Sequence, residues 1–466
     1  MGLPENVVSG ELARLVPVVA DTSREVRATS VLLATLQAVP AFARALLGSL
    51  GQSYGSRSSL SGYCEIVFKA NKDGQTHGRP DGFLVVERSS RLIWSALLEA
   101  KVGKSRIDEE QLTRYAVLAK SHGVNAVVTI SNEFVALPTH HPIRLSKTLL
   151  RNVDVFHWSW MHVLTEALLL LNSDGLGDSS QRFILQEMVR YFSHPSIGIS
   201  THDRMNSEWR ELVTGIQAGM TLSKASDVVR NSVGAWHQES RDLGLLMTRN
   251  LNRPVELRLS RAHQKDAGAR LKDDVDALVK SHKLSCSFTV PDAASPVHLV
   301  CDIERRSLTI SMNLQAPSDR QRASSRVNWV LRQIAKADPT DIHVRVNWPG
   351  RASPTQATLE SARNGAPGLI PDGAMLPTSF DLLLIRDLAG KFSGSKTFLE
   401  EVESALPHFY EQVGQYLREY IPSPPRVTAH KSTERKPEPV APDEGATENL
   451  PDGAEMQIET PRAGLN

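Results

Sequence analysis

The sequence predicts a mixed α/β protein: a sheet with helices packed on it, then a helical connector, then a second α/β or α+β domain. Three observations support this prediction. Residues 82–87 and 92–102 are expected to form a strand hairpin around a short serine turn. Residues 107–122 have an acidic start and end before Gly123, which is typical of a helix. A strand at 125–131 follows that helix, so helices and strands alternate along the chain.

The other elements are expected from hydrophobic spacing and turn residues. Residues 25–50 show helical spacing that Pro40 interrupts, and the Gly- and Ser-rich residues 51–62 are expected to form a loop. Residues 1–20 have no clear pattern, and residues 350–378 are rich in Gly, Pro and Ala. Further strands are expected at 65–70, 153–160, 286–290, 297–303, 308–314, 342–348 and 380–385, and further helices at 162–171, 181–192, 208–251, 319–337 and 396–420.

The length of 466 residues favours two or three domains. We expect a first α/β domain at 1–200, a helical connector at 201–253, a second domain of unknown role at 254–420 and a disordered tail at 421–466. The tail is expected to be disordered because it is rich in Pro, Glu, Thr and Gly and has few large apolar residues.

Composition is typical of a soluble globular protein, with 41% hydrophobic and 23% charged residues. The formal net charge of +1 means that any binding of nucleic acid must use local basic patches. Cys64, Cys286 and Cys301 are isolated, which fits a reducing compartment and forms neither a disulfide framework nor a zinc motif. The first residues do not resemble a secretory signal and no apolar stretch is long enough to span a bilayer, so we expect a cytoplasmic protein.

Two acidic residues and one lysine converge on the expected hairpin. Asp81 enters the first strand, and Glu99 and Lys101 lie at the end of the second, two residues apart and therefore on the same face. The hairpin folds Asp81 back beside Glu99, while Leu98 and Ala100 face the core. Buried Glu and Lys side chains are costly unless they pair with each other or hold a metal ion. Two acids with one lysine are also the minimal set for metal-dependent hydrolysis of a phosphodiester.

The following helix adds two polar side chains. Gln111 and Tyr115 are four residues apart, so they share a helix face that can lean over Glu99 and Lys101. Gln111 is able to hydrogen-bond a phosphate or a metal-bound water, and Tyr115 is able to do the same or to pack on a sugar.

The strings RPDG, LLEAK and EEQLTRYA together resemble the PD-(D/E)xK nuclease superfamily, in the subgroup with a Q-x-x-x-Y helix. The resemblance covers residues 20–165 and implies a restriction-endonuclease-like fold. It further implies that Asp81 and Glu99 bind Mg²⁺, which Mn²⁺ can replace, that the Ala100 carbonyl coordinates the ion, and that Lys101 activates the water. An acid on the first helix often completes the metal shell in this family, which suggests Glu25 first and Glu65 second.

These features predict a Mg²⁺-dependent nuclease that acts on DNA, in restriction, phage defence or repair in a bacterial cell. A homodimer or a protein partner bound through the C-terminal domain is also expected. One alternative is a catalytically silent module of the same build that holds nucleic acid or a partner. Another is an interaction protein whose main work lies in residues 200–420.

Each of these residues also has an ordinary structural interpretation. Asp81 is able to form a turn before Gly82, and Glu99 with Lys101 is able to form an edge-strand salt bridge. For Gln111 and Tyr115, the ordinary alternative is a helix with an exposed glutamine and a packed tyrosine. Lys104 and Arg106 are either phosphate contacts or surface charges, and the arginines at 320, 322, 326 and 332 are either a basic patch or, more naturally, a solvated helix face. The His140–His141 pair is expected in a loop, and His157, Trp158 and Trp160 in packing.

Overall fold

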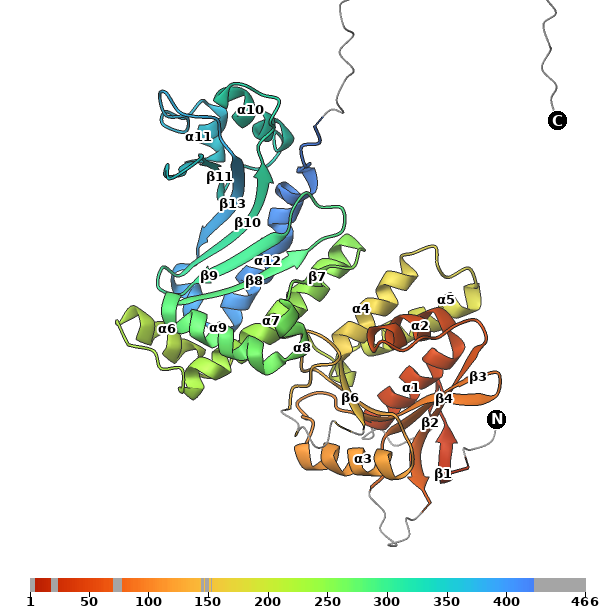
Figure 1. Cartoon of the computed structure of the whole chain (residues 1–466). Coiled ribbons are helices and arrows are strands. Elements are labelled where there is room, and N and C mark those ends of the chain that lie inside the picture. The colour runs from red at the N-terminus through yellow and green to blue at the C-terminus, as the bar shows by residue number, and fades with distance from the viewer. Residues whose placement is uncertain are drawn as a thin grey trace, which may run out of the picture. The chain divides into compact units, whose positions relative to one another are not determined.

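The computed structural model describes residues 5–17, 24–69, 78–143, 146, 151 and 153–422. The expected mixed α/β class is confirmed, because helices flank two separate sheets (Figure 1). Sheet A has six strands in the order β1-β2-β3-β4-β5-β6, and sheet B has seven in the order β12-β11-β13-β10-β9-β8-β7. The described residues up to 422 form one compact unit. The tail expected to be disordered lies outside the described residues apart from 421 and 422.

Sheet A is antiparallel over its first four strands and parallel from β4 to β6. The change of direction follows from the connections, since a short turn joins β3 to β4 while helix α3 crosses from β4 to β5. The strands are β1 (Val7–Leu12), β2 (Ser58–Phe68), β3 (Gly82–Arg88), β4 (Arg91–Ala100), β5 (Ala126–Ser131) and β6 (Asp154–Ser159).

Helices cover both faces of sheet A. One hydrophobic cluster joins the sheet to α1 (Arg24–Ala38), α2 (Pro40–Ser49), α4 (Trp160–Leu171) and α5 (Ser179–Phe192). A second cluster joins the opposite face to α3 (Glu109–Ser121). The alternation of β4 divides its side chains between the two, with Leu98 and Ala100 in the first cluster and Leu97 in the second. Glu99 therefore points to the α3 side, as Leu97 does.

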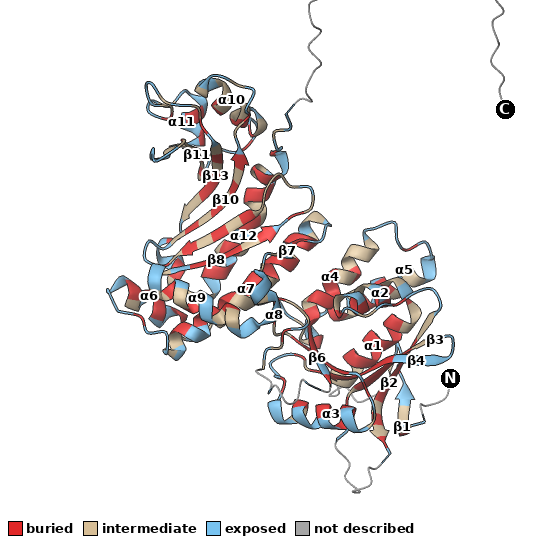
Figure 2. Ribbon diagram, in the orientation of Figure 1, coloured by how far each residue is buried: buried red, intermediate tan, exposed pale blue. Residues whose placement is uncertain are grey.

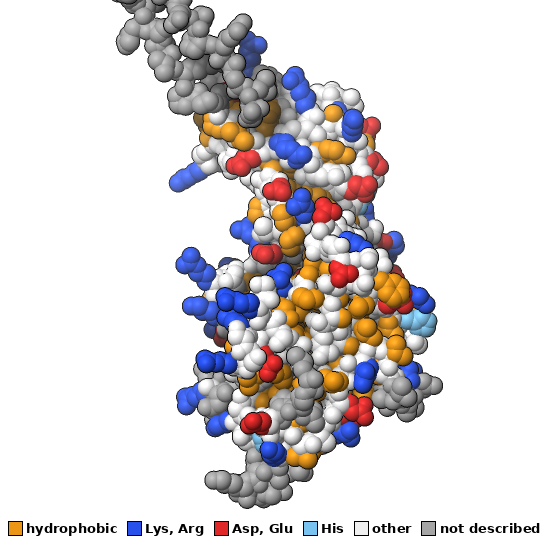
Figure 3. All heavy atoms as spheres, turned by 90° about the vertical axis from the view of Figure 1, so that its right-hand side faces the viewer, with side chains coloured by type: hydrophobic (Ala, Val, Ile, Leu, Met, Phe, Trp, Pro, Cys, Tyr) orange, Lys and Arg blue, Asp and Glu red, His pale blue; other side chains and the backbone are white. Residues whose placement is uncertain are grey.

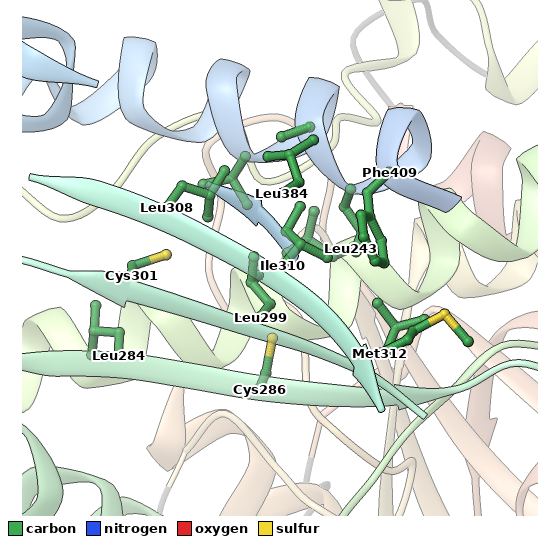
Figure 4. Close-up of a cluster of buried hydrophobic side chains, with 14 of the residues drawn as sticks. Leu243, Leu284, Cys286, Leu299, Cys301, Leu308, Ile310, Met312, Leu384 and Phe409 are labelled. Atoms are coloured by element: carbon green, nitrogen blue, oxygen red, sulfur yellow. The ribbon is translucent and has the colours of Figure 1, made fainter. Parts of the chain in front are cut away.

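Sheet B is antiparallel throughout and has one core face. Buried and partly exposed residues alternate along β9, β10 and β11, as Figure 2 shows by colour. Figure 4 shows Leu299, Ile310 and Met312 of the core facing Leu243 and Phe409 from helices α7 and α12. The strands are β7 (Glu256–Leu257), β8 (Lys283–Thr289), β9 (Val297–Asp302), β10 (Ser307–Gln315), β11 (Ile342–Asn347), β12 (Thr355–Thr358) and β13 (Ser379–Asp387).

Most of the helices after residue 200 contribute residues to the core of sheet B, although α8 has no buried residue. Those expected to form a connector, α6 and α7, contribute Trp209, Leu212, Trp236 and Leu243 to it. The helical segments are η2 (Pro195–Ile197), α6 (Trp209–Gln217), α7 (Asp227–Leu251), α8 (Arg261–Lys265), α9 (Ala267–Ser281), α10 (Ala323–Gln333), α11 (Leu359–Arg363), η3 (Ala389–Ser393), α12 (Ser395–Gln412) and η4 (Gly414–Tyr416).

Several local expectations were wrong. Residues 58–62 belong to β2 rather than to a loop, because Gly62 packs flat on Leu33, where a Cβ atom would meet the leucine Cβ at 2.7 Å. Residues 7–12 form an edge strand whose register with β2 shifts twice, which removes the regular alternation that marks a strand in sequence. Helix α9 was missed altogether. The helix expected at 319–337 covers only Ala323–Gln333.

Among the described residues, no single helix is long and apolar enough to cross a membrane; α1 and α2 meet that test only as a pair, across a bend of 112°. All three cysteines are buried and unpaired. Burial raises the pKa of the Cys64 thiol to about 11 and that of Cys286 to about 12.

Candidate active site

The β3–β4 register brings Asp81 next to the end of β4. Gly82 pairs with Leu98, so the residue before Gly82 lies beside the residue after Leu98, which is Glu99. Asp81 Oδ2 accepts the backbone N–H of Ala100 at 2.9 Å. On the other side, the Asp81 carbonyl accepts the N–H of Glu65 at 3.2 Å. The carboxyl group of Asp81 is thereby fixed between β2 and β4.

Glu99 lies at the centre of a hydrogen-bonded group. Its side chain is buried, with 4% exposed, and its Oε1 atom accepts from Lys101 Nζ at 2.5 Å and from Gln111 Nε2 at 2.6 Å. Lys101, which directly follows β4, and Gln111, on the facing helix α3, thus both donate to one oxygen of Glu99. The structure therefore brings together Asp81, Glu99, Lys101 and Gln111.

Tyr115 extends this group toward the strand entry. Gln111 Nε2 lies 3.2 Å from Tyr115 Oη, which donates to the Arg79 carbonyl at 3.1 Å. Helix α3 sets this geometry because its N-cap, Asp108, accepts from the N–H groups of Glu110 and Gln111. Gly78 at φ +107° lies over the Tyr115 ring, where a Cβ would come within 3.1 Å of it.

The two acids suggested as further ligands occupy different surroundings. Glu25, at the start of α1, lies with Oε2 3.8 Å from Lys101 Nζ and with Oε1 3.5 Å from the N–H of Val102. Glu65 instead pairs with Arg79 at 3.0 Å, and its side chain is 38% exposed. Glu25 therefore faces the lysine of the site, whereas Glu65 is turned to an arginine at its edge. Ala100 contributes its N–H to Asp81, and the role of its carbonyl stays a prediction.

Burial and mutual repulsion shape the charges of this group. Burial, and then the charge of Glu99, raise the pKa of Asp81 to about 7, although the Ala100 N–H and Lys101 oppose the rise. Burial likewise raises the pKa of Glu99, against the hydrogen bond from Lys101. Burial lowers the pKa of Lys101, but its contact with Glu99 outweighs that effect and the pKa is raised. Three carboxylates around one ammonium group leave an excess of negative charge that a cation would relieve.

The oxygen donors suit a hard divalent cation such as Mg²⁺. Glu99 Oε2 is buried and has no hydrogen-bond partner in the part of the chain that the structure describes, which is costly for a carboxylate oxygen unless another group binds it. Mg²⁺ is commonly bound by one or two carboxylates together with several waters. In the described part of the chain, no three Asp, Glu, His or Cys side chains are already arranged as a metal cage. The residues thus fit an ion held by Asp81, Glu99 and water.

Sequence reasoning missed two residues that touch the site's backbone. Trp160 Nε1 donates to the Lys101 carbonyl at 2.8 Å, and Asn132 Nδ2 donates to the Gly103 carbonyl at 3.1 Å. Trp160 was expected only to pack. A signal existed for it, because a buried indole N–H needs an acceptor and this tryptophan opens an apolar helix. No local pattern marks Asn132.

His157, which was expected in packing, and His141, which was expected in a loop, are linked by hydrogen bonds through Thr129. Thr129 Oγ1 lies 2.9 Å from His141 Nε2 and 2.8 Å from His157 Nδ1. Burial lowers the pKa of His157 to about 3 and that of His141 to about 4. Both rings are neutral at pH 7, and their nitrogens are engaged with Thr129, Glu133 and Ile143.

The arginines near α10 lie in two kinds of surroundings, one hydrogen-bonded to loop backbone and others exposed to solvent. Arg326 donates to the carbonyls of Arg320 and Pro377, each at 2.8 Å, and so braces the surrounding loops. Arg322 and Arg332 are exposed, as are Lys104 and Arg106 after the site strand. Figure 3 shows Lys and Arg gathered along the left edge of one face, with Asp and Glu scattered over it. No face-wide field of one sign is evident there.

No family model matches this chain, and no curated protein matches it either.

Proposed function

We propose that this chain is a Mg²⁺-dependent nuclease that hydrolyses phosphodiester bonds, with DNA as its substrate. The observation that carries the proposal is the meeting of Lys101 and Gln111 at one oxygen of buried Glu99, while the other oxygen has no hydrogen-bond partner among the described residues. Asp81 lies beside it and Glu25 faces the same lysine. A plain edge-strand salt bridge would be exposed and would need none of these additional groups.

Each side chain has a role in this proposal. Asp81 and the free Oε2 of Glu99 would hold the ion, and Glu25 would take a water of its shell. A bound Mg²⁺ neutralises charge on the phosphate and makes its water more acidic. Lys101 orients the attacking water and stabilises the negative charge that develops on the phosphate. Glu99 Oε1 keeps Lys101 and Gln111 in place during these steps, since the ion would use the other oxygen.

Gln111 and Tyr115 serve orientation rather than proton transfer. Burial, together with the charge of Glu99, raises the pKa of Tyr115, so its hydroxyl stays neutral at working pH and donates hydrogen bonds. Gln111 links this hydroxyl to Glu99. DNA as the substrate, a dimer or partner bound through the C-terminal domain, and a role in restriction, phage defence or repair rest on the resemblance of residues 20–165. A cytoplasmic location is proposed from the isolated cysteines and from apolar stretches too short to span a bilayer.

The proposal is tested by cleavage of nucleic acid. Purified chain is incubated with supercoiled plasmid, linear DNA and RNA, in Mg²⁺, in Mn²⁺ and in EDTA, beside Lys101→Ala. We expect cleavage that requires metal and falls by a factor of about 10²–10⁴ in Lys101→Ala, the usual contribution of a group that transfers protons. Lys120→Ala, which removes an exposed lysine from the last turn of α3, is the matched control. Absent cleavage by all proteins would favour the silent binding module, and cleavage that persists in EDTA and in Lys101→Ala would contradict the proposed site.

A further inference from the structure

The three residues that follow β4 have no regular structure, yet every backbone polar group among them is hydrogen-bonded. Residues 101–103 leave the end of the sheet and carry Lys101 at their start. Each of their N–H and C=O groups has a different partner, and five of the six partners come from other parts of the chain, while Ser105 closes a local turn. Those partners are the Ile130 carbonyl for Lys101 N at 2.8 Å, Trp160 Nε1 for Lys101 O at 2.8 Å, Glu25 Oε1 for Val102 N at 3.5 Å, Ser105 N for Val102 O at 3.3 Å, the Gly198 carbonyl for Gly103 N at 2.9 Å, and Asn132 Nδ2 for Gly103 O at 3.1 Å.

Trp160 holds the carbonyl of Lys101 itself. It is the first residue of α4, which is capped by Ser159, and it is fully buried with its ring 5.0 Å from that of Phe192. The indole N–H is the group that reaches Lys101. Because the indole ring is rigid and stands at the capped end of a helix, it restricts the position of the Lys101 carbonyl more than a flexible side chain would.

Asn132 ties the same segment to a second one. Its Nδ2 donates to the carbonyls of Gly103 and Gly198, and its Oδ1 accepts the N–H of Ser200 at 3.2 Å. Gly198 has φ +83°, and a Cβ there would stand 2.9 Å from the Gly103 nitrogen, so the two backbones touch. Both the nitrogen and the oxygen of this amide thus join residue 103 to residues 198–200.

We propose that Trp160 and Asn132 are positioning residues that fix the backbone of Lys101 for catalysis. This inference rests on the proposed nuclease function, because it assigns Lys101 a catalytic role. The physical reason is the steep dependence of catalysis on geometry, since a misplacement of about 1 Å costs roughly a hundredfold in rate. Neither residue reaches the substrate, and each acts through the peptide groups of 101–103.

Trp158 supplies a matched control for Trp160. It is also fully buried on β6, and its indole N–H also has one partner, Ser49 Oγ at 3.0 Å on α2. Trp160→Phe and Trp158→Phe remove the same atoms and one hydrogen bond each, but only the first bond belongs to Lys101. Asn132→Ala is paired in the same way with Asn125→Ala, since Asn125 Oδ1 accepts the N–H of Ser95, in the middle of β4, at 2.9 Å.

The experiment compares these four full-length variants by two readouts. The first is steady-state cleavage, for which we expect Trp160→Phe and Asn132→Ala to lower kcat about tenfold or more with KM unchanged, while the controls keep kcat. The second is amide hydrogen exchange of residues 101–105 in metal-free protein, which needs no activity. We expect faster exchange there in the two site variants than in the matched controls.

The two readouts separate the possible failures. If wild type does not cleave, the proposed function fails, and exchange alone still reports whether Trp160 and Asn132 hold the segment. If wild type cleaves and Trp160→Phe resembles Trp158→Phe in kcat and in exchange, the positioning role is overturned. Equal loss of thermal stability in both tryptophan variants is expected and does not alter this comparison.

Discussion

Asp81 and Ala100 are joined across the hairpin, with Asp81 Oδ2 accepting the Ala100 N–H at 2.9 Å. This bond places the carboxyl group of Asp81 beside the end of β4, and it involves neither carboxyl oxygen of Glu99. It also means that the first acid of the site serves both structure and charge. Substitutions at Asp81 must therefore be chosen to keep an acceptor there.

Asp81→Asn is expected to fold and to lose activity. The amide oxygen can still accept from Ala100, while the negative charge that would bind the metal is gone. Because burial and Glu99 raise the pKa of Asp81, removing its charge should leave melting temperature unchanged or higher at pH 8. Cleavage assays and thermal denaturation check this, and an Asp81→Asn protein that cuts at the wild-type rate would contradict the assignment.

Glu25→Gln and Glu65→Gln should differ, although both acids were suggested by the resemblance. Glu25 faces Lys101, whereas Glu65 pairs with Arg79 at the edge. We expect Glu25→Gln to weaken Mn²⁺ affinity about tenfold, in the range usual for groups that support a metal's ligands, and Glu65→Gln to leave it unchanged. Calorimetric titration with Mn²⁺ decides the matter, and the reverse order would place Glu65 at the metal.

Tyr115→Phe tests the link between helix α3 and the strand entry. The change removes the hydroxyl that donates to the Arg79 carbonyl and contacts Gln111, and leaves that carbonyl without this donor. We expect the free energy of unfolding to fall by about 1–3 kcal/mol, with KM raised more than kcat is lowered. Urea denaturation and steady-state kinetics measure the two effects; an unaltered protein in both would exclude this link.

Stability should fall as pH rises through the weakly acidic range, because of a buried acid on α7. Glu239 is fully buried, and neither of its carboxyl oxygens has a hydrogen-bond partner among the described residues. Burial, followed by the charges of Asp242 and Glu403, raises its pKa well above 4.5. The folded state therefore holds a proton that the unfolded state releases above about pH 4.5. This contribution is complete below that pH and is lost as pH rises toward the folded-state pKa.

Glu239→Gln should flatten that dependence. We expect wild type to lose more stability than Glu239→Gln between pH 5 and pH 8, measured as melting temperature at matched ionic strength. Glu403 adds to the effect, because burial and Asp242 raise its pKa to about 7. Glu187→Gln, on the surface of α5, is the control. Parallel curves for wild type and Glu239→Gln would show that Glu239 carries no retained proton.

The sequence predicted the site where its residues are close together along the chain and lie on one strand or one helix. Strand alternation placed Glu99 and Lys101 on one face, and helical spacing placed Gln111 and Tyr115 together; the structure shows these four side chains in contact. The order of Glu25 before Glu65 came from the resemblance and from no local motif, since the surroundings of both acids depend on where α1 and the bulge at Glu65 (φ +49°) fall in three dimensions. Trp160 and Asn132 were missed because contacts 59 and 29 residues apart in sequence leave no periodic signal.

The second half shows the same limit. Residues 286–290, 297–303 and 308–314 alternate clearly and were expected as strands, and the structure has β8, β9 and β10 there. Residues 350–378 have a composition typical of turns, yet β12 and α11 form within them because Leu359 and Ala362 reach the core. These short elements form because some of their residues are buried in the tertiary structure, and composition alone does not reveal that burial.

The most direct test of the central claim is a titration of the full chain with Mn²⁺, followed by calorimetry, for wild type and Asp81→Asn. The proposed centre requires that Asp81 and the unpartnered oxygen of Glu99 bind the ion. We expect saturable binding to wild type that Asp81→Asn abolishes, with cleavage of DNA appearing over the same range of metal concentration. Wild-type protein that cleaves DNA without binding metal, or that binds metal equally well as Asp81→Asn, would contradict the account.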